Sequence, residues 1–149
     1  MKASIEEKSR QYSIKDVSIF LAEIKLDQYI QKFEENEITG DVLLSLNLES
    51  FEELEVFSAL HKLKIIVNFR RHLEQTGVEH PVFNVIQVLA QNKLIKYRRL
   101  VEQNGIDGDM LLYEDDKLVR CMFKEVGIGS DLDISKIISK FKTFASRRK

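Results

Sequence analysis

The sequence has few of the residues that form disulfides and metal sites. Its 149 residues include one cysteine, one proline, three histidines and no tryptophan. A single cysteine cannot form an internal disulfide, and without a second thiol or clustered histidines it offers no zinc site. Cys121 is therefore expected to be a core residue in a reducing compartment. We predict no metal and no cofactor.

Long apolar runs are also lacking. No run approaches the roughly 18 residues needed to cross a bilayer, and the start MKASIEEKSRQ is charged where a signal peptide has an apolar segment. With 44% hydrophobic and 32% charged residues the composition is ordinary for a folded globular protein. We expect a cytoplasmic protein without a membrane segment.

Residues arranged for catalysis are not found either. His61 and His72 fall on one expected helix, but they are 11 residues and hence about 16 Å apart, and His80 lies in a linker. No Ser/His/Asp or Cys/His set has a plausible arrangement. The sequence predicts that the chain is not an enzyme.

Charge is distributed unevenly, although the net charge is only −1. Residues 1–75 hold 10 basic and 14 acidic side chains, while residues 76–149 hold 13 and 10. The stretch from Glu34 to Glu55 contains eight carboxylates and no lysine or arginine. The first half is therefore acidic, the second is basic, and the acidity of the first is concentrated in one stretch.

The two halves repeat one pattern. ENEITGDVLLSL, from Glu35, returns as QNGIDGDMLLYE, from Gln103, at an offset of 68. The offset becomes 72 where Ile65 and Ile66 match Ile137 and Ile138, which places a four-residue insertion near residues 113–119. Self-similarity of this size indicates two copies of one structural unit.

Each unit is predicted to be helical. Ser13 and Asp16 form a capping-box pattern before apolar residues at helical spacing, Ser58 begins the longest helix of the first unit, and Gly77 is suited to close it. Ser130 begins the last helix of the second unit. The predicted fold class is all-α, with two consecutive five-helix bundles packed in tandem.

The order of five helices, with the last longest and the pattern L..Y...F..N.I.G..LL.L in the middle, resembles the sterile alpha motif (SAM) domain. The resemblance assigns SAM domain 1 to residues 12–76 and a more divergent SAM domain 2 to residues 81–145. The usual tryptophan of the first helix is replaced by Phe20 and Val88, and Glu55 stands where a glycine usually precedes the last helix.

This resemblance implies a function in protein association. SAM domains commonly associate head to tail, an acidic mid-domain surface docking on the positive start of a neighbour's last helix. We expect an oligomerisation module that scaffolds a signalling assembly, with itself or other SAM-domain proteins as partners. The acidic residues are Glu35, Glu37, Asp41, Glu49, Glu52, Glu53, Asp107, Asp109, Asp115 and Asp116. The helix-end residues are His61, Lys62 and Lys64.

The two copies differ at the start of the last helix. Asp131 and Asp133 occupy that place in the second copy and would repel an acidic partner. The first copy is therefore expected to present both surfaces, and the second mainly the acidic one. The alternative is that these charges only keep the surface soluble.

A tight linker suggests that the two units pack together. The helix after Pro81 is apolar almost all round, which leaves a second face to bury. On the preceding helix, Leu60, Leu63 and Val67 form the expected core stripe, and other apolar residues lie more than 100° away from it. The predicted inter-domain contact joins Ile65 and Phe69 to Val82, Phe83 or Ile86. The alternative is that the helix simply has a broad core face.

Two other interpretations stay open. RNA-hairpin binding would use the basic residues Lys93, Lys96, Arg98 and Arg99 and the tail SRRK, although a pI near 6.3 makes nucleic acid an unlikely partner. The tandem arrangement is also similar to the oligomerisation segment of SARM-type TIR proteins and to SAM pairs in ankyrin-repeat and liprin scaffolds. In each of these cases the chain itself would be the scaffold.

Overall fold

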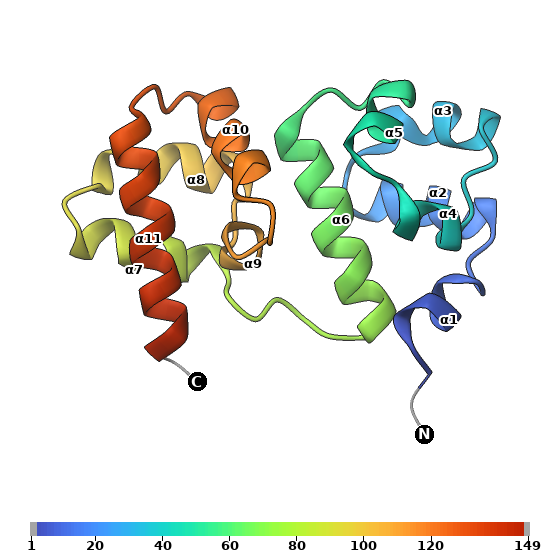
Figure 1. The fold of residues 1–149 in the computed structure, drawn as a ribbon, viewed down its shortest axis with the longest axis horizontal. Helices are drawn as coiled ribbons and strands as arrows, with labels where there is room; N and C mark the ends of the chain where they lie inside the picture. Colours follow the sequence, from blue (N-terminus) through green and yellow to red (C-terminus); the bar gives the residue numbers. More distant parts are fainter. Residues whose placement is uncertain (1–2, 148–149) are drawn as a thin grey trace. The chain divides into compact units, whose positions relative to one another are not determined.

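A computed structural model describes residues 3–147 of the chain. This part contains helices and no strand, so the predicted all-α fold class is confirmed. The chain divides into two compact units, Met1–Thr76 and Gly77–Lys149 (Figure 1). No helix among the described residues is both long and apolar enough to cross a membrane.

The first unit contains the five expected helical segments and one more at its start. The expected segments are α2 (Ile14–Glu23), η1 with α3 (Asp27–Tyr29 and Ile30–Glu35), α4 (Gly40–Ser45), α5 (Leu48–Glu53) and α6 (Ala59–Glu74). The additional helix, α1 (Ile5–Ser9), was not predicted; it is capped by Ser4, whose hydroxyl accepts from the Glu7 amide at 3.1 Å, and it packs on α4 and α6.

Polar caps begin the helices where the sequence predicted them. Ser13 and Asp16 form the reciprocal capping box of α2, and the Ser58 hydroxyl accepts from the His61 amide at 3.1 Å to begin α6. The predicted end of α6 was wrong. Gln75, not Gly77, adopts the left-handed conformation there, with φ 57°. Its amide bonds back to the last turn, so the helix ends two residues earlier than the glycine suggested.

The core of the first unit is built around aromatic residues. Phe69 on α6 packs edge-on to Tyr12 at 5.5 Å and tilted against Phe20 at 5.2 Å between ring centroids. Ile65 and Leu73 belong to the same buried cluster. The core face of α6 therefore runs through Ile65 and Phe69, which the sequence analysis had placed outside the core stripe.

The second unit has the same order of segments. They are α7 (Val82–Gln91), η2 with α8 (Ile95–Tyr97 and Arg98–Asn104), α9 (Gly108–Leu111), α10 (Asp116–Val126) and α11 (Asp131–Arg147). The Ser130 hydroxyl accepts from the Asp133 amide at 3.1 Å, as predicted for the start of the last helix. The insertion lies where α10, with 11 residues, replaces the 6-residue α5 of the first unit.

The two units repeat the same loop hydrogen bonds at the offsets found in the sequence. Four backbone hydrogen bonds of the first unit, each from an amide to a carbonyl group, have a counterpart at the matching positions of the second unit. The pairs are Leu26 to Leu21 (2.9 Å) and Leu94 to Leu89 (2.9 Å); Ile38 to Phe33 (3.0 Å) and Ile106 to Val101 (3.1 Å); Gly40 to Tyr12 (2.9 Å) and Gly108 to His80 (2.7 Å); Val56 to Phe51 (2.9 Å) and Ile128 to Phe123 (3.0 Å).

One core prediction was wrong. Cys121 is exposed, whereas its neighbours Met122 and Phe123 are buried. The cause is helical geometry: on α10 each step of one residue turns the side chain by about 100°, so Cys121 faces out when the next two residues face in.

Candidate interaction surfaces

The acidic stretch from Glu34 to Glu55 contains carboxylates that make hydrogen bonds or ion pairs and carboxylates that make neither. Three of the eight, Glu37, Glu49 and Glu53, are exposed and make no hydrogen bond or ion pair with any described residue. The others are engaged as follows: Glu34 with Ser18 (3.0 Å), Glu35 with Gln31 (3.0 Å), Asp41 with Thr39 (2.5 Å), Glu52 with Lys62 (3.3 Å) and Glu55 with Lys32 (3.3 Å).

We call the exposed residues Glu37, Glu49 and Glu53, together with the exposed Val42 and Leu48 of the same stretch, the acidic surface. Val42 and Leu48 are each 37% exposed, although both are apolar. Glu49 and Glu53 are four residues apart, and α5 places them about 6 Å apart along its axis, on one face. A surface of this kind combines unpaired negative charge with apolar area, which suits a basic partner.

Asp41, at the start of α4, is charged for a local reason. The Thr39 hydroxyl donates to its carboxylate and lowers the pKa of Asp41, with smaller contributions from backbone amides and from the charge of Arg10. Asp41, Arg10 and Glu6 also line a shallow hollow of about 390 Å³ between α1 and α4. The Asp41 carboxylate therefore already has a hydrogen-bond donor and a nearby cation in its own unit.

The predicted helix-end residues are engaged inside the first unit. His61 Nδ1 lies 2.6 Å from the Tyr29 hydroxyl, and the two rings meet edge to face. Lys62 places its Nζ 3.3 Å from Glu52 Oε1, and only 8% of its side chain is exposed. Lys64 is half-buried. Lys62 and Glu52, which the sequence analysis assigned to two opposite surfaces, are thus paired with each other.

The start of the last helix in the second unit, α11, carries two acidic residues, Asp131 and Asp133. Each of them has a partner within the second unit. The Tyr97 hydroxyl donates to Asp133, and this hydrogen bond raises the pKa of Tyr97. Lys96 Nζ also lies 3.7 Å from Asp133. Lys124 Nζ lies 2.9 Å from Asp131 and lowers the pKa of that carboxyl by hydrogen bond and charge. The start of α11 therefore carries acidic groups with cations of the same unit beside them.

The four predicted acidic residues of the second unit all have structural contacts. Asp107 is buried and caps α9 through the Met110 amide at 3.1 Å; Asp115 caps α10 through the Leu118 amide at 3.2 Å. Asp116 lies 3.0 Å from Lys142 Nζ. Asp109 accepts from two backbone amides. These contacts anchor helix starts, so the acidic character of this unit serves its own fold first.

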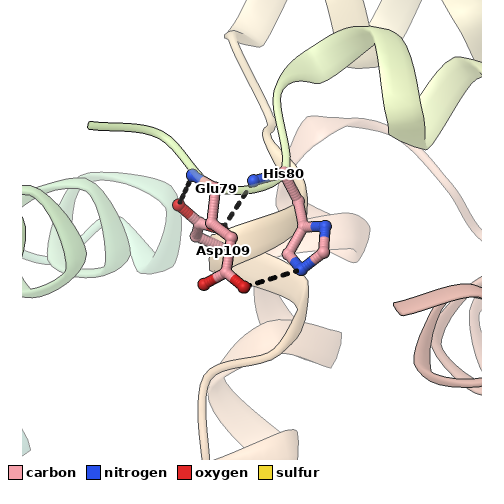
Figure 2. Close-up of side chains that lie close together, drawn as sticks. All are labelled: Glu79, His80 and Asp109. Carbon is pink, nitrogen blue, oxygen red and sulfur yellow. Dashed lines mark hydrogen bonds and ion pairs between the residues drawn. The ribbon is translucent and has the colours of Figure 1, made fainter. Parts of the chain in front are cut away.

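Asp109 belongs to a cluster that sequence reasoning missed. Its two carboxylate oxygens accept from the amides of Glu79 (3.1 Å) and His80 (3.0 Å), and Glu79 Oε1 lies 3.8 Å from His80 Nε2 (Figure 2). Carboxylates and a histidine within 4.8 Å of one another are a possible set of metal ligands. Because both oxygens of Asp109 already bind backbone amides, the cluster is explained as a clamp that holds residues 79–80 on the start of α9. No motif could have revealed it, since its members are 29 and 30 residues apart.

The predicted inter-domain residues divide into two groups. Ile65 and Phe69 are core residues of the first unit, which removes the premise that they lie off its core face. On α7, Val82 and Ile86 are half-buried and Phe83 is 64% exposed. Packing between the units stays a prediction.

Comparison with known proteins identifies the first unit. Residues 10–73 match the family model of the SAM domain (Sterile alpha motif). Searches of curated proteins and of solved structures returned no match. The matched range begins before α2, ends one residue before the end of α6 and includes every residue of the acidic surface. SAM domains are in general non-catalytic modules of protein–protein interaction, and residues 10–73 of this chain are a SAM domain.

Proposed function

We propose that this chain is a tandem SAM module that joins protein molecules through the acidic surface of its first unit. The observation that carries the proposal is the set of three unpaired carboxylates, Glu37, Glu49 and Glu53, in a stretch of a SAM domain that also exposes Val42 and Leu48. Solvent-facing carboxylates without partners are free to pair with cations of another molecule, and exposed apolar side chains add area to bury.

The proposal includes a second, divergent SAM domain in residues 77–147. It is supported by the loop hydrogen bonds that recur at offsets of 68 and 72, and by the equivalent Tyr29–His61 and Tyr97–Asp133 contacts. The partner is a second copy of the chain or another SAM-domain protein. Contacts between different surfaces of identical molecules build chains or rings, so the proposed role is that of a scaffold.

The helix-end part of the original hypothesis is weaker than the acidic part. Lys62 is nearly buried and paired with Glu52, so it has little freedom to accept a carboxylate from another molecule. Lys62→Glu would place a carboxylate against Glu52 and disturb the fold, which makes it a poor test of association.

RNA binding has less support. Of the four basic residues proposed for it besides the tail SRRK, Lys96 is paired with Asp133 and Arg98 with Glu102. The last two residues of that tail, Arg148 and Lys149, lie outside the described residues. Paired cations contribute less to the concentrated positive field that nucleic acid requires. A link to a SARM-type or other parent protein stays a prediction.

The test of the proposal is a double charge reversal in the acidic surface. Sedimentation velocity of the unchanged chain over a concentration series should show self-association that weakens as ionic strength rises from about 0.01 M to about 1 M, because the Debye length falls from about 30 Å to about 3 Å. Glu49→Lys with Glu53→Lys should weaken it by about tenfold or more, since each exposed ion pair is worth up to about 1 kcal/mol and each is replaced by repulsion.

A matched control changes the charge equally elsewhere. Glu23 and Glu74 are exposed residues at the ends of α2 and α6, where lysine is compatible with the helix dipole. Glu23→Lys with Glu74→Lys should leave the association as it is. The proposal is wrong if the chain stays a monomer and binds no other SAM-domain protein, or if the control weakens association as much as the acidic-surface variant.

A further inference from the structure

A groove in the second unit is a candidate receptor for a negatively charged partner. It lies between α7 and α11, which pack on each other, and has a volume of about 370 Å³. Its walls are basic, polar and apolar, and none of the described residues that line it is acidic: Val88, Gln91, Asn92, Lys140, Thr143, Phe144 and Arg147.

The two cations of this groove belong to the cations of the unit that have no ion-pair partner among the described residues. Lys96, Arg98, Lys124 and Lys142 pair with carboxylates of the second unit. Lys140 and Arg147 are exposed and make no ion pair with any described residue. They are seven residues apart on α11, which places them on one face and about 10.5 Å apart along the helix axis.

The walls between these cations are held in place. Asn92 donates to the Val88 carbonyl at 2.7 Å, and the Thr143 hydroxyl donates to the Ser139 carbonyl at 3.2 Å. Phe144 packs on the buried Phe141 at 5.6 Å between ring centroids. The groove is thus formed by side chains that are held within the second unit, with Phe144 between Lys140 and Arg147 along α11.

We propose that this groove binds the acidic surface of a second copy of the chain. The inference rests on the proposed function and names the receptor that the helix-end residues of the first unit do not supply. Two features match: Glu49 and Glu53 are unpaired carboxylates on one face, and Leu48 beside them is partly exposed, while the groove offers two unpaired cations around Val88 and Phe144. By sequence the first unit has an excess of four acidic residues and the second an excess of three basic ones.

This contact joins different surfaces, so each copy would offer one donor surface and one receptor. Because the long side chains of lysine and arginine span several ångströms, two carboxylates about 6 Å apart can be reached by cations about 10.5 Å apart. Such an interface does not close on itself unless geometry forms a ring. The association should therefore continue to grow with concentration rather than stop at a dimer.

The test uses charge reversal on both sides of the contact, in the full chain. Lys140→Glu with Arg147→Glu should weaken self-association in sedimentation velocity by about tenfold or more, as Glu49→Lys with Glu53→Lys should. An equimolar mixture of the two variants should associate again, because each variant then meets an oppositely charged surface on the other. Circular dichroism checks that each variant is folded, and Lys140→Gln with Arg147→Gln replaces the reversal if it is not.

The control is Arg99→Glu with Lys117→Glu, which changes the charge equally at two exposed residues outside the groove and should leave the association unchanged. If Lys140→Glu with Arg147→Glu associates like the unchanged chain while the acidic-surface variant does not, the groove is not the receptor and the proposed function survives. If neither variant changes the association, both proposals fail. Loss of binding to an RNA hairpin in a gel shift, with self-association intact, would assign the groove to nucleic acid and overturn the inference.

Discussion

The two units use one set of backbone contacts to carry two different surfaces. The same four loop hydrogen bonds recur, and an aromatic ring on the last helix meets Tyr12 in the first unit and His80 in the second, at 5.5 and 5.7 Å. In contrast, the tyrosine that ends the 3-10 turn hydrogen-bonds to His61 in the first unit (Tyr29) and to Asp133 in the second (Tyr97). The backbone hydrogen bonds of the loops are thus the same in the two units, while the charged groups at the start of the last helix differ.

The largest expected effect concerns the glycine that begins α4 and α9. A Cβ atom on Gly40 would lie 2.3 Å from the Ser9 carbonyl oxygen, and one on Gly108 would lie 2.2 Å from Phe141 Cζ. Gly40→Ala and Gly108→Ala should each destabilise their own unit by about 3 kcal/mol, measured by thermal or urea unfolding. The neighbour of Gly40 is backbone and cannot move aside, so Gly40→Ala should cost at least as much as Gly108→Ala.

Gly77→Ala is the control for both. Nothing lies within 4 Å of a Cβ added there, so this change should leave the unfolding transition nearly unchanged or raise it slightly. Equal loss of stability in all three variants would show that the close approach is not the reason for glycine.

A smaller difference lies in the turn before the last helix. Glu55 in the first unit and Gly127 in the second both have positive φ, 62° and 120°. A residue other than glycine costs about 1–2 kcal/mol in the left-handed region. Glu55→Gly should recover part of this free energy but lose the weak ion pair of Lys32 with Glu55. The net stabilisation of the first unit should be about 0.5 kcal/mol. Gly127→Ala should destabilise the second unit by about 1–2 kcal/mol. Urea unfolding of both variants measures the contrast.

Glu55→Ala separates the effect of the ion pair from the effect of the backbone conformation. It removes the ion pair with Lys32 but keeps a Cβ atom at positive φ. It should be close to neutral or slightly destabilising. If Glu55→Ala stabilised the unit as much as Glu55→Gly, the backbone conformation would not be the cause.

The smallest effect distinguishes two carboxyl groups with lowered pKa values. Asp41 owes its low pKa first to the Thr39 hydroxyl, and Asp131 owes its low pKa to Lys124. Each folded-state pKa lies below the unfolded value, so each group stabilises the fold above the unfolded pKa, and this contribution is lost as pH falls through the folded pKa. High salt should raise the pKa of Asp131 toward its ordinary value and move that of Asp41 much less, since exposed ion pairs are screened.

Carboxyl chemical shifts in an NMR titration at low and high salt measure this difference. Lys124→Ala should raise the pKa of Asp131 even at low salt, and Thr39→Val should raise that of Asp41 at both. An equal salt response of the two carboxyl groups would contradict the assignment of their causes.

Much of the fold follows from local patterns in the sequence. The capping box at Ser13 and Asp16, the cap at Ser58 and the cap at Ser130 were all predicted, because each depends on residues within one turn. The loop hydrogen bonds that recur in the two units do so at the same offsets of 68 and 72. The short helix α1 was missed, since a five-residue helix has too few positions to show a period.

The candidate site was less predictable. The acidic stretch was visible from composition, but nothing local could show that Lys62 pairs with Glu52, ten residues earlier, or that Lys140 and Arg147 are left without partners beside a groove. The rotation of α6 was also misjudged: Ile65 and Phe69 face the core because Tyr12 and Phe20 pack against Phe69.

By itself, then, the sequence determined most helix starts, the internal repeat and the unequal charge of the two halves, because these can be read from the order of residues along the chain. Which charges stay unpaired was decided only by tertiary structure. Ion pairing requires two groups within about 4 Å, and folding brings together residues far apart in the chain, such as Asp116 and Lys142, while it leaves Glu49, Glu53, Lys140 and Arg147 facing solvent.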